Sequence, residues 1–255
     1  MKNLKDFKYE QSFGFADIIR TQIKTGDGPF DTHHFFNNMG DVFLNKALKP
    51  NKKTLLHEFI EESIFQQVEA AAKMDFEAFR PELIELIACH QEGSNITTPI
   101  QDTNPENYSR DYLMGAFENQ ALKSLTKEVF NLLFSDRRIM QEFNSAAAEK
   151  ILKMKKEHYP NYLQKDGMMI RYSRWPGWLR RGLGFRDKMR CVECHADLSQ
   201  SLTTNSRDAI DHVVPLAKGG INDPTNLQIL CNSCNSKKGG VNSSTTGSND
   251  LYWDY

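Results

Sequence analysis

"AIDHVVPLAKGGINDPTNLQILCNSCNSKKGG", residues 209–240, is the stretch that decides the fold of the C-terminal part of the chain. Its apolar, β-branched beginning predicts a strand that carries an Asp-His pair and then turns at a Gly-Gly pair. "NDPTNLQILC" predicts a second turn and strand, and "CNSCNSKK" predicts a helix. A β-hairpin backed by a helix would bring four polar side chains together around one site: Asp211, His212, Asn226 and Asn235.

Two Cys-x-x-Cys pairs frame this region. Cys191 and Cys194 form the first pair, and Cys231 and Cys234 form the second. Four thiolates at the corners of a tetrahedron are the ligand set of a structural Zn²⁺. In a reducing compartment this spacing favours a metal site over disulfides. We therefore expect a zinc ion that ties the ends of a short domain and couples its folding to metal binding.

The order of these motifs carries a family resemblance. With "RDKMRCVEC" ahead of the Asp-His pair, residues 182–242 resemble the HNH endonucleases, a family of ββα-metal nucleases, in their zinc-bound four-cysteine form. The resemblance implies hydrolysis of a phosphodiester bond, with His212 as the general base that takes a proton from water. It also implies that Asp211 and Asn235 hold one Mg²⁺ or Mn²⁺ through oxygen ligands. Asn226 would fix the His-bearing loop by hydrogen bonds.

The letters HNH stand for the motif residues His, Asn and His. Asn235 occupies the position of the last His, so it departs from the family pattern. An amide oxygen is a harder ligand than imidazole, so Mg²⁺ or Mn²⁺ should be preferred over soft metals. The arrangement is similar to the HNH domain of RNA-guided CRISPR nucleases, so the substitution is compatible with an active enzyme. The alternative is a zinc ribbon that binds nucleic acid without cutting it, although such a scaffold has no need of the Asp-His pair.

The net charge of −1 hides an uneven distribution of charge along the chain. Residues 1–150 carry 17 basic and 23 acidic side chains, whereas residues 151–190 carry 11 and 3. A positive segment beside the motif is typical of phosphate contacts, so we expect nucleic acid to bind the C-terminal half. The family resemblance favours DNA. The expected contacts are Arg180, Arg181, Arg186, Lys188, Arg190, Lys237 and Lys238, of which the last two equally fit a helix surface.

The first half of the chain predicts a mostly α-helical module. Apolar residues recur at intervals of three and four over residues 53–90, where Pro81 is expected to separate two helices. Residues 110–157 predict further long helices, with "SDRR" at residues 135–138 as a break.

Several conspicuous side chains favour a structural interpretation. The adjacent His33 and His34 near Asp31 indicate a polar corner better than a metal site. Cys89 is expected to be a core thiol. Exposed aromatic rings in the basic segment could stack on nucleic-acid bases, but the interpretation as core anchors is favoured for three of them: Trp175, Trp178 and Phe185.

These patterns together predict an α+β chain. We expect a helical module over residues 1–152, for target recognition or for docking of a protein partner or second copy, and a basic aromatic connector over residues 153–190. A small zinc-stabilised ββα-metal domain should follow over residues 191–240, and a flexible tail with an aromatic, docking-peptide-like end over residues 241–255. This arrangement is similar to HNH effectors of bacterial anti-phage defence, which a partner protein controls. With no apolar run near the roughly 18 residues of a membrane span and no secretory signal, we expect a cytoplasmic protein.

Overall fold

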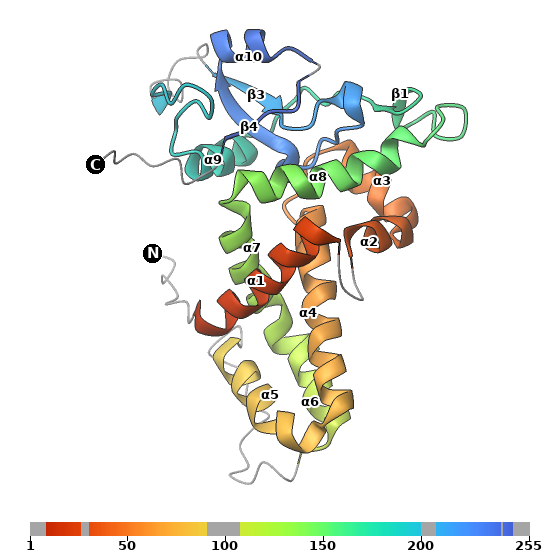
Figure 1. The fold of residues 1–255 in the computed structure, drawn as a ribbon, viewed down its shortest axis with the longest axis vertical. Coiled ribbons are helices and arrows are strands. Elements are labelled where there is room, and N and C mark those ends of the chain that lie inside the picture. The colour runs from red at the N-terminus through yellow and green to blue at the C-terminus, as the bar shows by residue number, and fades with distance from the viewer. Residues whose placement is uncertain (1–8, 27–30, 91–107, 200–207, 241, 247–255) are drawn as a thin grey trace. The chain divides into compact units, whose positions relative to one another are not determined.

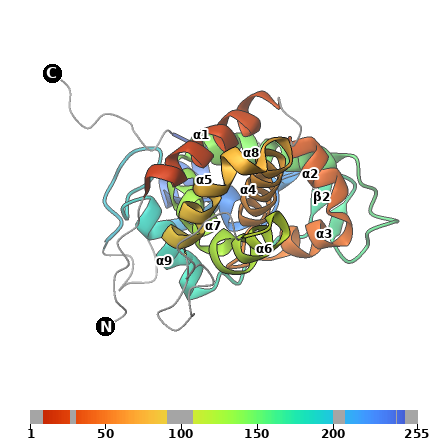
Figure 2. The same ribbon diagram turned by 90° about the horizontal axis from the view of Figure 1, so that it is seen from below.

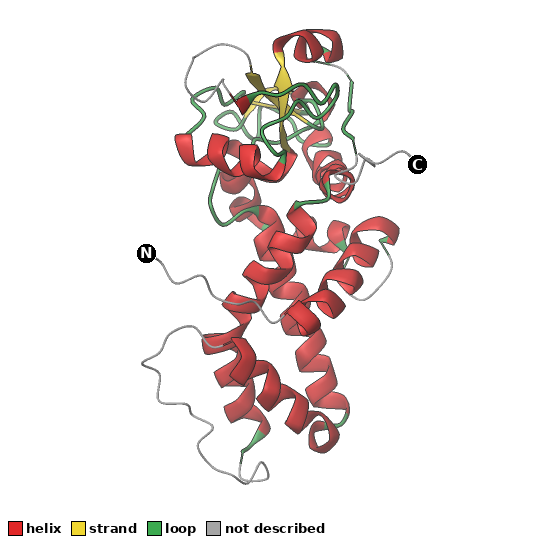
Figure 3. Cartoon of the chain, turned by 90° about the vertical axis from the view of Figure 1, so that its left-hand side faces the viewer, coloured by secondary structure: helices red, strands yellow, loops and turns green. Residues whose placement is uncertain are grey.

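A computed structural model describes residues 9–26, 31–90, 108–199, 208–240 and 242–246 (Figure 1). The chain divides into two compact units. We call residues 1–19 and 57–132 the helical unit, and residues 20–56 and 133–255 the motif-bearing unit. None of the described helices is both long and apolar enough to cross a membrane. The predicted α+β class, helical in the first half with small strands near the C-terminus, is confirmed (Figure 3).

The helical unit contains only helices among its described residues (Figure 1). Its elements are α1 (Tyr9–Thr25), α4 (Leu55–Met74), α5 (Phe76–His90), α6 (Arg110–Ala116), a π-helical turn (Phe117–Ala121) and α7 (Leu122–Phe134), of which α1, α4 and α7 continue into the other unit. Leu125 and Val129 of α7 are fully buried. A polar cluster is also buried there, because Ser12 Oγ donates to Glu128 Oε2 at 2.6 Å and His90 Nε2 lies 3.4 Å from the same oxygen.

The break between α4 and α5 falls at Asp75, so the prediction that Pro81 separates two helices is wrong. Asp75 Oδ1 accepts a hydrogen bond from the backbone N–H of Ala78, which caps the start of α5. Pro81 then lies in the second turn, where it costs the helix a single backbone hydrogen bond. The predicted break at residues 135–138 is confirmed, since Asp136 caps the next helix through the N–H groups of Arg138 and Ile139.

The motif-bearing unit combines helices with two small antiparallel sheets. Its elements are α2 (Thr32–Asn38), α3 (Gly40–Leu48), α8 (Arg137–Leu152), β1 (Leu163–Lys165), β2 (Met168–Met169), α9 (Gly177–Arg186), β3 (Asp208–His212), β4 (Leu227–Cys231) and α10 (Asn232–Lys238). Helices α2 and α3 lie on the same side of the unit as β2 (Figure 2). The predicted strand, strand and helix of the motif are confirmed as β3, β4 and α10, with Asp211 opposite Gln228 and His212 opposite Leu227.

The division into units differs from the boundary expected at residue 152, because residues 20–56 and 133–152 belong with the motif. The loop between β3 and β4 is hydrogen-bonded to these helices. Asp223 Oδ2 accepts from the backbone N–H of Leu55 at 3.0 Å, and Asn144 Nδ2 donates to Thr225 Oγ1 at 3.1 Å. Burial of the motif against α3 and α8, which no short-range pattern encodes, explains the difference.

The segment after α10 is also anchored over the residues that the structure describes. The sequence predicts a flexible tail from residue 241, but residues 242–246 are held by side chains of the unit. Arg137 Nε donates to Thr246 O at 3.0 Å, and Gln228 Nε2 donates to Ser244 O at 3.0 Å. The aromatic end, in residues 247–255, lies outside the described residues.

A hydrophobic core joins α9 to β4 and to the first cysteine pair. Leu179 and Leu183 of α9 are buried in it, and Trp175 and Trp178 pack against it as expected. Phe185 is instead 91% exposed, so its assignment as a core anchor is wrong. It lies on α9 away from the buried leucine positions.

A buried ion network lies beside this core. Asp187 accepts from Arg186 at 2.8 Å, from the backbone N–H of Ile229 at 3.1 Å and from Arg137 at 3.5 Å. The Arg186 guanidinium also lies over the ring of Phe134, 4.9 Å from its centroid. The Arg186 side chain is therefore buried and paired with Asp187, and the prediction that it contacts nucleic acid is wrong.

We predict that Asp187→Asn lowers the free energy of unfolding by about 3 to 5 kcal/mol, because it leaves buried guanidinium charge without its counter-ion. Chemical denaturation of the metal-loaded protein measures this loss. Asp166→Asn is the matched control, since Asp166 pairs with Lys155 on the surface. Equal stability of the two variants would contradict the structural role of the network.

Candidate metal centre and polar cleft

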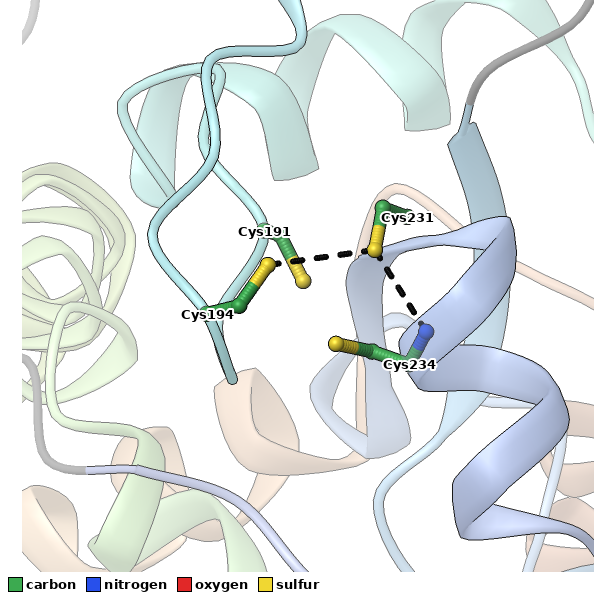
Figure 4. Close-up of side chains that lie close together, drawn as sticks. All are labelled: Cys191, Cys194, Cys231 and Cys234. Atoms are coloured by element: carbon green, nitrogen blue, oxygen red, sulfur yellow. Dashed lines mark hydrogen bonds between the residues drawn. The ribbon is translucent and has the colours of Figure 1, made fainter.

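The two cysteine pairs converge on one point. The four Sγ atoms lie within 4.8 Å of one another, and those of Cys194 and Cys231 are 3.8 Å apart (Figure 4). Among the described residues, this is the one group of three or more His, Cys, Asp or Glu side chains that could hold a metal ion. Its chemistry fits zinc, since four sulfur ligands close a tetrahedral shell.

Local backbone structure presents each pair. The first pair lies on a turn in which the N–H of His195 donates to Cys191 O at 2.9 Å, and His195 has a left-handed φ of 58°. The second pair begins α10, where Cys231 Sγ accepts from the backbone N–H of Cys234 at 3.4 Å. That hydrogen bond is the main cause that lowers the pKa of Cys231 to about 7, whereas the contact with the Cys231 sulfur is the main cause that raises the pKa of Cys234.

A polar cleft of about 400 Å³ opens beside the end of β3. Asp211 and His212 from β3 line it together with Asn235 from α10, as the sequence predicts for these three side chains. Arg171, from the segment before α9, lines the same cleft. The cleft therefore brings together an imidazole, a carboxylate, an amide and a guanidinium.

Asn226 is fully buried and is not among the residues that line the cleft. Its Oδ1 accepts from the N–H of Val214 at 2.8 Å, and its Nδ2 donates to Val214 O and Ile221 O, both at 2.9 Å. Its backbone carbonyl accepts from the N–H of Val213. These bonds cross-link the loop that follows His212, which is the arrangement expected of a residue that orients that loop.

His212 is buried, with 4% of its surface exposed. Its Nε2 lies 3.0 Å from Asn222 Oδ1, and its ring centroid lies 5.8 Å from that of Trp175. Burial lowers the pKa of His212 to about 4, although the hydrogen bond to Asn222 opposes the shift. The imidazole is therefore neutral at physiological pH.

Two neighbours hold the Asp211 carboxylate. Lys238 Nζ donates to Asp211 Oδ2 at 2.6 Å and also to the backbone carbonyl of His212. Gln228, directly opposite on β4, donates to the same carboxylate oxygen at 3.2 Å. Lys238 is buried by these contacts, so the prediction that it binds phosphate is wrong.

The other predicted nucleic-acid contacts differ in exposure. Arg181, Lys188, Arg190 and Lys237 are exposed, whereas Arg180 is half-buried. Lys237 lines a second cleft of about 490 Å³ together with Lys218 and residues 242–244. The exposed cations remain available for contact with a polyanion.

The side chains interpreted as structural in the first half do not form a metal site in the described part of the chain. Asp31 caps α2 by accepting from the N–H of His34 at 2.7 Å, and His33 Nδ1 lies 3.6 Å from Glu149. Cys89 is half-buried in α5. Asn222 and Gln228 contact the predicted site residues, but neither was anticipated, because nothing in the sequence separates them from ordinary loop and strand residues.

A β-hairpin followed by a helix, with an Asp-His pair on the first strand and a four-cysteine cluster, is the ββα-metal arrangement. Residues 191–240 match the family model described as HNH endonuclease. A relative from Lactococcus phage SK1, named "Probable HNH endonuclease", is 39% identical over 59 residues, which cover 21% of this chain and 56% of the relative. No solved structure matches the chain. The C-terminal part of the chain therefore carries a domain of the HNH nuclease type.

We predict that Cys194→Ser removes bound zinc and lowers the melting temperature, because three thiolates hold a structural zinc less tightly than four. Metal content by elemental analysis and thermal unfolding measure the two effects. Cys89→Ser is the matched control, since Cys89 lies in α5 outside the cluster. Full zinc content in Cys194→Ser would contradict the four-cysteine site.

Proposed function

We propose that the protein is a metal-dependent HNH endonuclease that hydrolyses phosphodiester bonds in DNA. One observation carries the proposal: Asp211, His212 and Asn235, which all belong to the segment that matches the family, line a single cleft. A zinc ribbon that only binds nucleic acid would need the cysteine cluster but not this cleft. We therefore treat the ribbon as the alternative that an activity assay must exclude.

The donor atoms of the cleft fit a hard divalent cation. Asp211 offers a carboxylate and Asn235 an amide oxygen, which are ligand types that Mg²⁺ and Mn²⁺ prefer. Bound there, the cation would stabilise the negative charge that develops on the phosphate and on the departing 3′ oxygen. Lys238 and Gln228 orient the Asp211 carboxylate from opposite elements, α10 and β4.

The chain's own residues would handle the proton. The unprotonated ring of His212 would accept a proton from water as the water oxygen forms a bond to phosphorus and the bond to the 3′ oxygen breaks. The cation Arg171 in the same cleft favours binding of the phosphate. Asn226 keeps the loop after His212 in one conformation through its buried hydrogen bonds.

The four cysteines would hold a structural Zn²⁺, separate from the catalytic cation. The nucleic acid would contact the exposed cations Arg181, Lys188, Arg190 and Lys237 and the half-buried Arg180. The helical unit belongs to the part of the chain in which acidic side chains outnumber basic ones. It would serve target recognition, or the docking of a protein partner or second copy that controls cutting. Such control would suit a defence or restriction nuclease. Stoichiometric co-purification of a partner from the native host tests the docking role.

We predict that purified protein nicks supercoiled plasmid in the presence of Mg²⁺ or Mn²⁺, and that His212→Ala slows nicking by about 100- to 10,000-fold through loss of the general base. Gel analysis of nicked and linear product measures the rate. His158→Ala is the matched control, because His158 is an exposed histidine paired only with its neighbour Glu157 among the ion pairs of the described residues. Undiminished cutting by His212→Ala would refute the assigned base, and no cutting by the zinc-loaded wild type would favour the ribbon.

We predict that Lys237→Ala weakens DNA binding and reduces the slope of log affinity against log salt by about 1, because one phosphate contact is lost. Fluorescence anisotropy over a salt series measures the slope. Lys73→Ala is the control, since Lys73 pairs with Glu69 on α4. An unchanged slope would remove Lys237 from the interface.

A further inference from the structure

Asn222 is a fully buried residue in the loop between β3 and β4. Its backbone N–H donates to Ala47 O at 2.8 Å. Its side-chain Nδ2 donates to Leu48 O and to Ile170 O, both at 2.9 Å. Asn222 therefore ties the loop to the end of α3 and to the segment after β2.

These two carbonyls fix the orientation of the Asn222 amide. Carbonyl oxygens accept hydrogen bonds and never donate, so the group that faces Leu48 O and Ile170 O must be the NH₂. Oδ1 is then the atom that accepts from the backbone N–H of Tyr172 at 3.3 Å and lies 3.0 Å from His212 Nε2.

The orientation of the amide determines the tautomer of His212. An amide oxygen has no hydrogen to donate, so Nε2 must carry the hydrogen in this bond. A neutral imidazole has one N–H, which leaves the basic lone pair on Nδ1. We infer that Asn222 is a positioning residue that holds His212 in the Nε2–H tautomer, with Nδ1 as the nitrogen that takes the proton from water.

The catalytic part of this inference rests on the proposed nuclease function, whereas the tautomer is a property of the folded chain. The acceptors that orient Asn222 belong to Leu48 and Ile170, outside residues 191–240, which match the family. The general base is thus oriented by α3 and by the segment after β2. Neither Gln nor Ala at position 222 could reproduce all four side-chain contacts. The Gln side chain is one methylene group too long, and the Ala side chain has no polar atoms.

Nitrogen-15 spectra of histidine-labelled full-length protein test the tautomer directly. The zinc-loaded chain is measured at neutral pH without Mg²⁺, and His212→Ala identifies the signals of His212 among the seven histidines. We expect an N–H nitrogen at Nε2 and a lone-pair nitrogen at Nδ1 in the wild type. The opposite tautomer in the wild type would overturn the inference without the need of any variant.

Asn222→Ala should convert the His212 signals to a mixture of tautomers and lower kcat about 10- to 100-fold while leaving the affinity for DNA unchanged. Asn144→Ala is the matched control: Asn144 is equally buried and bonded to Thr225 in the same loop, so its loss should reduce stability and leave the His212 tautomer intact. An unaltered tautomer or unaltered kcat in Asn222→Ala would overturn the positioning role. If the wild type shows the expected tautomer but cuts no nucleic acid, the tautomer assignment stands and the proposed nuclease function fails.

Discussion

The hydrogen bonds of two buried asparagines in the loop between β3 and β4 are the constraint on which the candidate site depends. Asn226 cross-links the loop to itself, and Asn222 links it to His212, Leu48 and Ile170. Each buried amide is stable only where its donors and acceptors are paired, so each admits one arrangement of its neighbours. These hydrogen bonds offset the free-energy cost of burying the polar groups of the loop. They also give His212 a defined orientation and a defined tautomer.

The loop also joins the motif to the rest of its unit. Asp223 caps the N-terminus of α4 through Leu55, and Thr225 is bonded to Asn144 of α8. Asp187 accepts hydrogen bonds from two arginines and from a backbone N–H of β4. The cysteine cluster therefore closes one end of the motif, while helices from distant parts of the sequence hold the other. This explains how so short a hairpin can keep charged and polar side chains ordered beside a cleft.

The sequence alone predicts the local structure of the motif well, because strand patterning, the Gly-Gly turn and the cysteine spacing all act over short range. It also predicts that Asp211, His212 and Asn235 meet. The sequence does not predict which side chains contacts with distant segments bury. Arg186 and Lys238 were expected to be surface cations, but both are paired inside the fold. Phe185 was expected to be a core residue, but it is exposed. The role of Asn222 depends on carbonyls of residues 48 and 170, so no motif within the hairpin could have revealed it.

In the proposed reaction, water attacks phosphorus in the cleft and the 3′ oxygen departs. The chemistry of the cut ends tests this most directly. Supercoiled plasmid is incubated with the zinc-loaded protein and Mg²⁺, and any nicked product is isolated and treated with DNA ligase without prior end repair. Departure of the 3′ oxygen leaves 3′-hydroxyl and 5′-phosphate ends, so we expect ligase to reseal the nicks. Nicks that ligase seals only after end repair, or no nicking with any divalent cation, would contradict it.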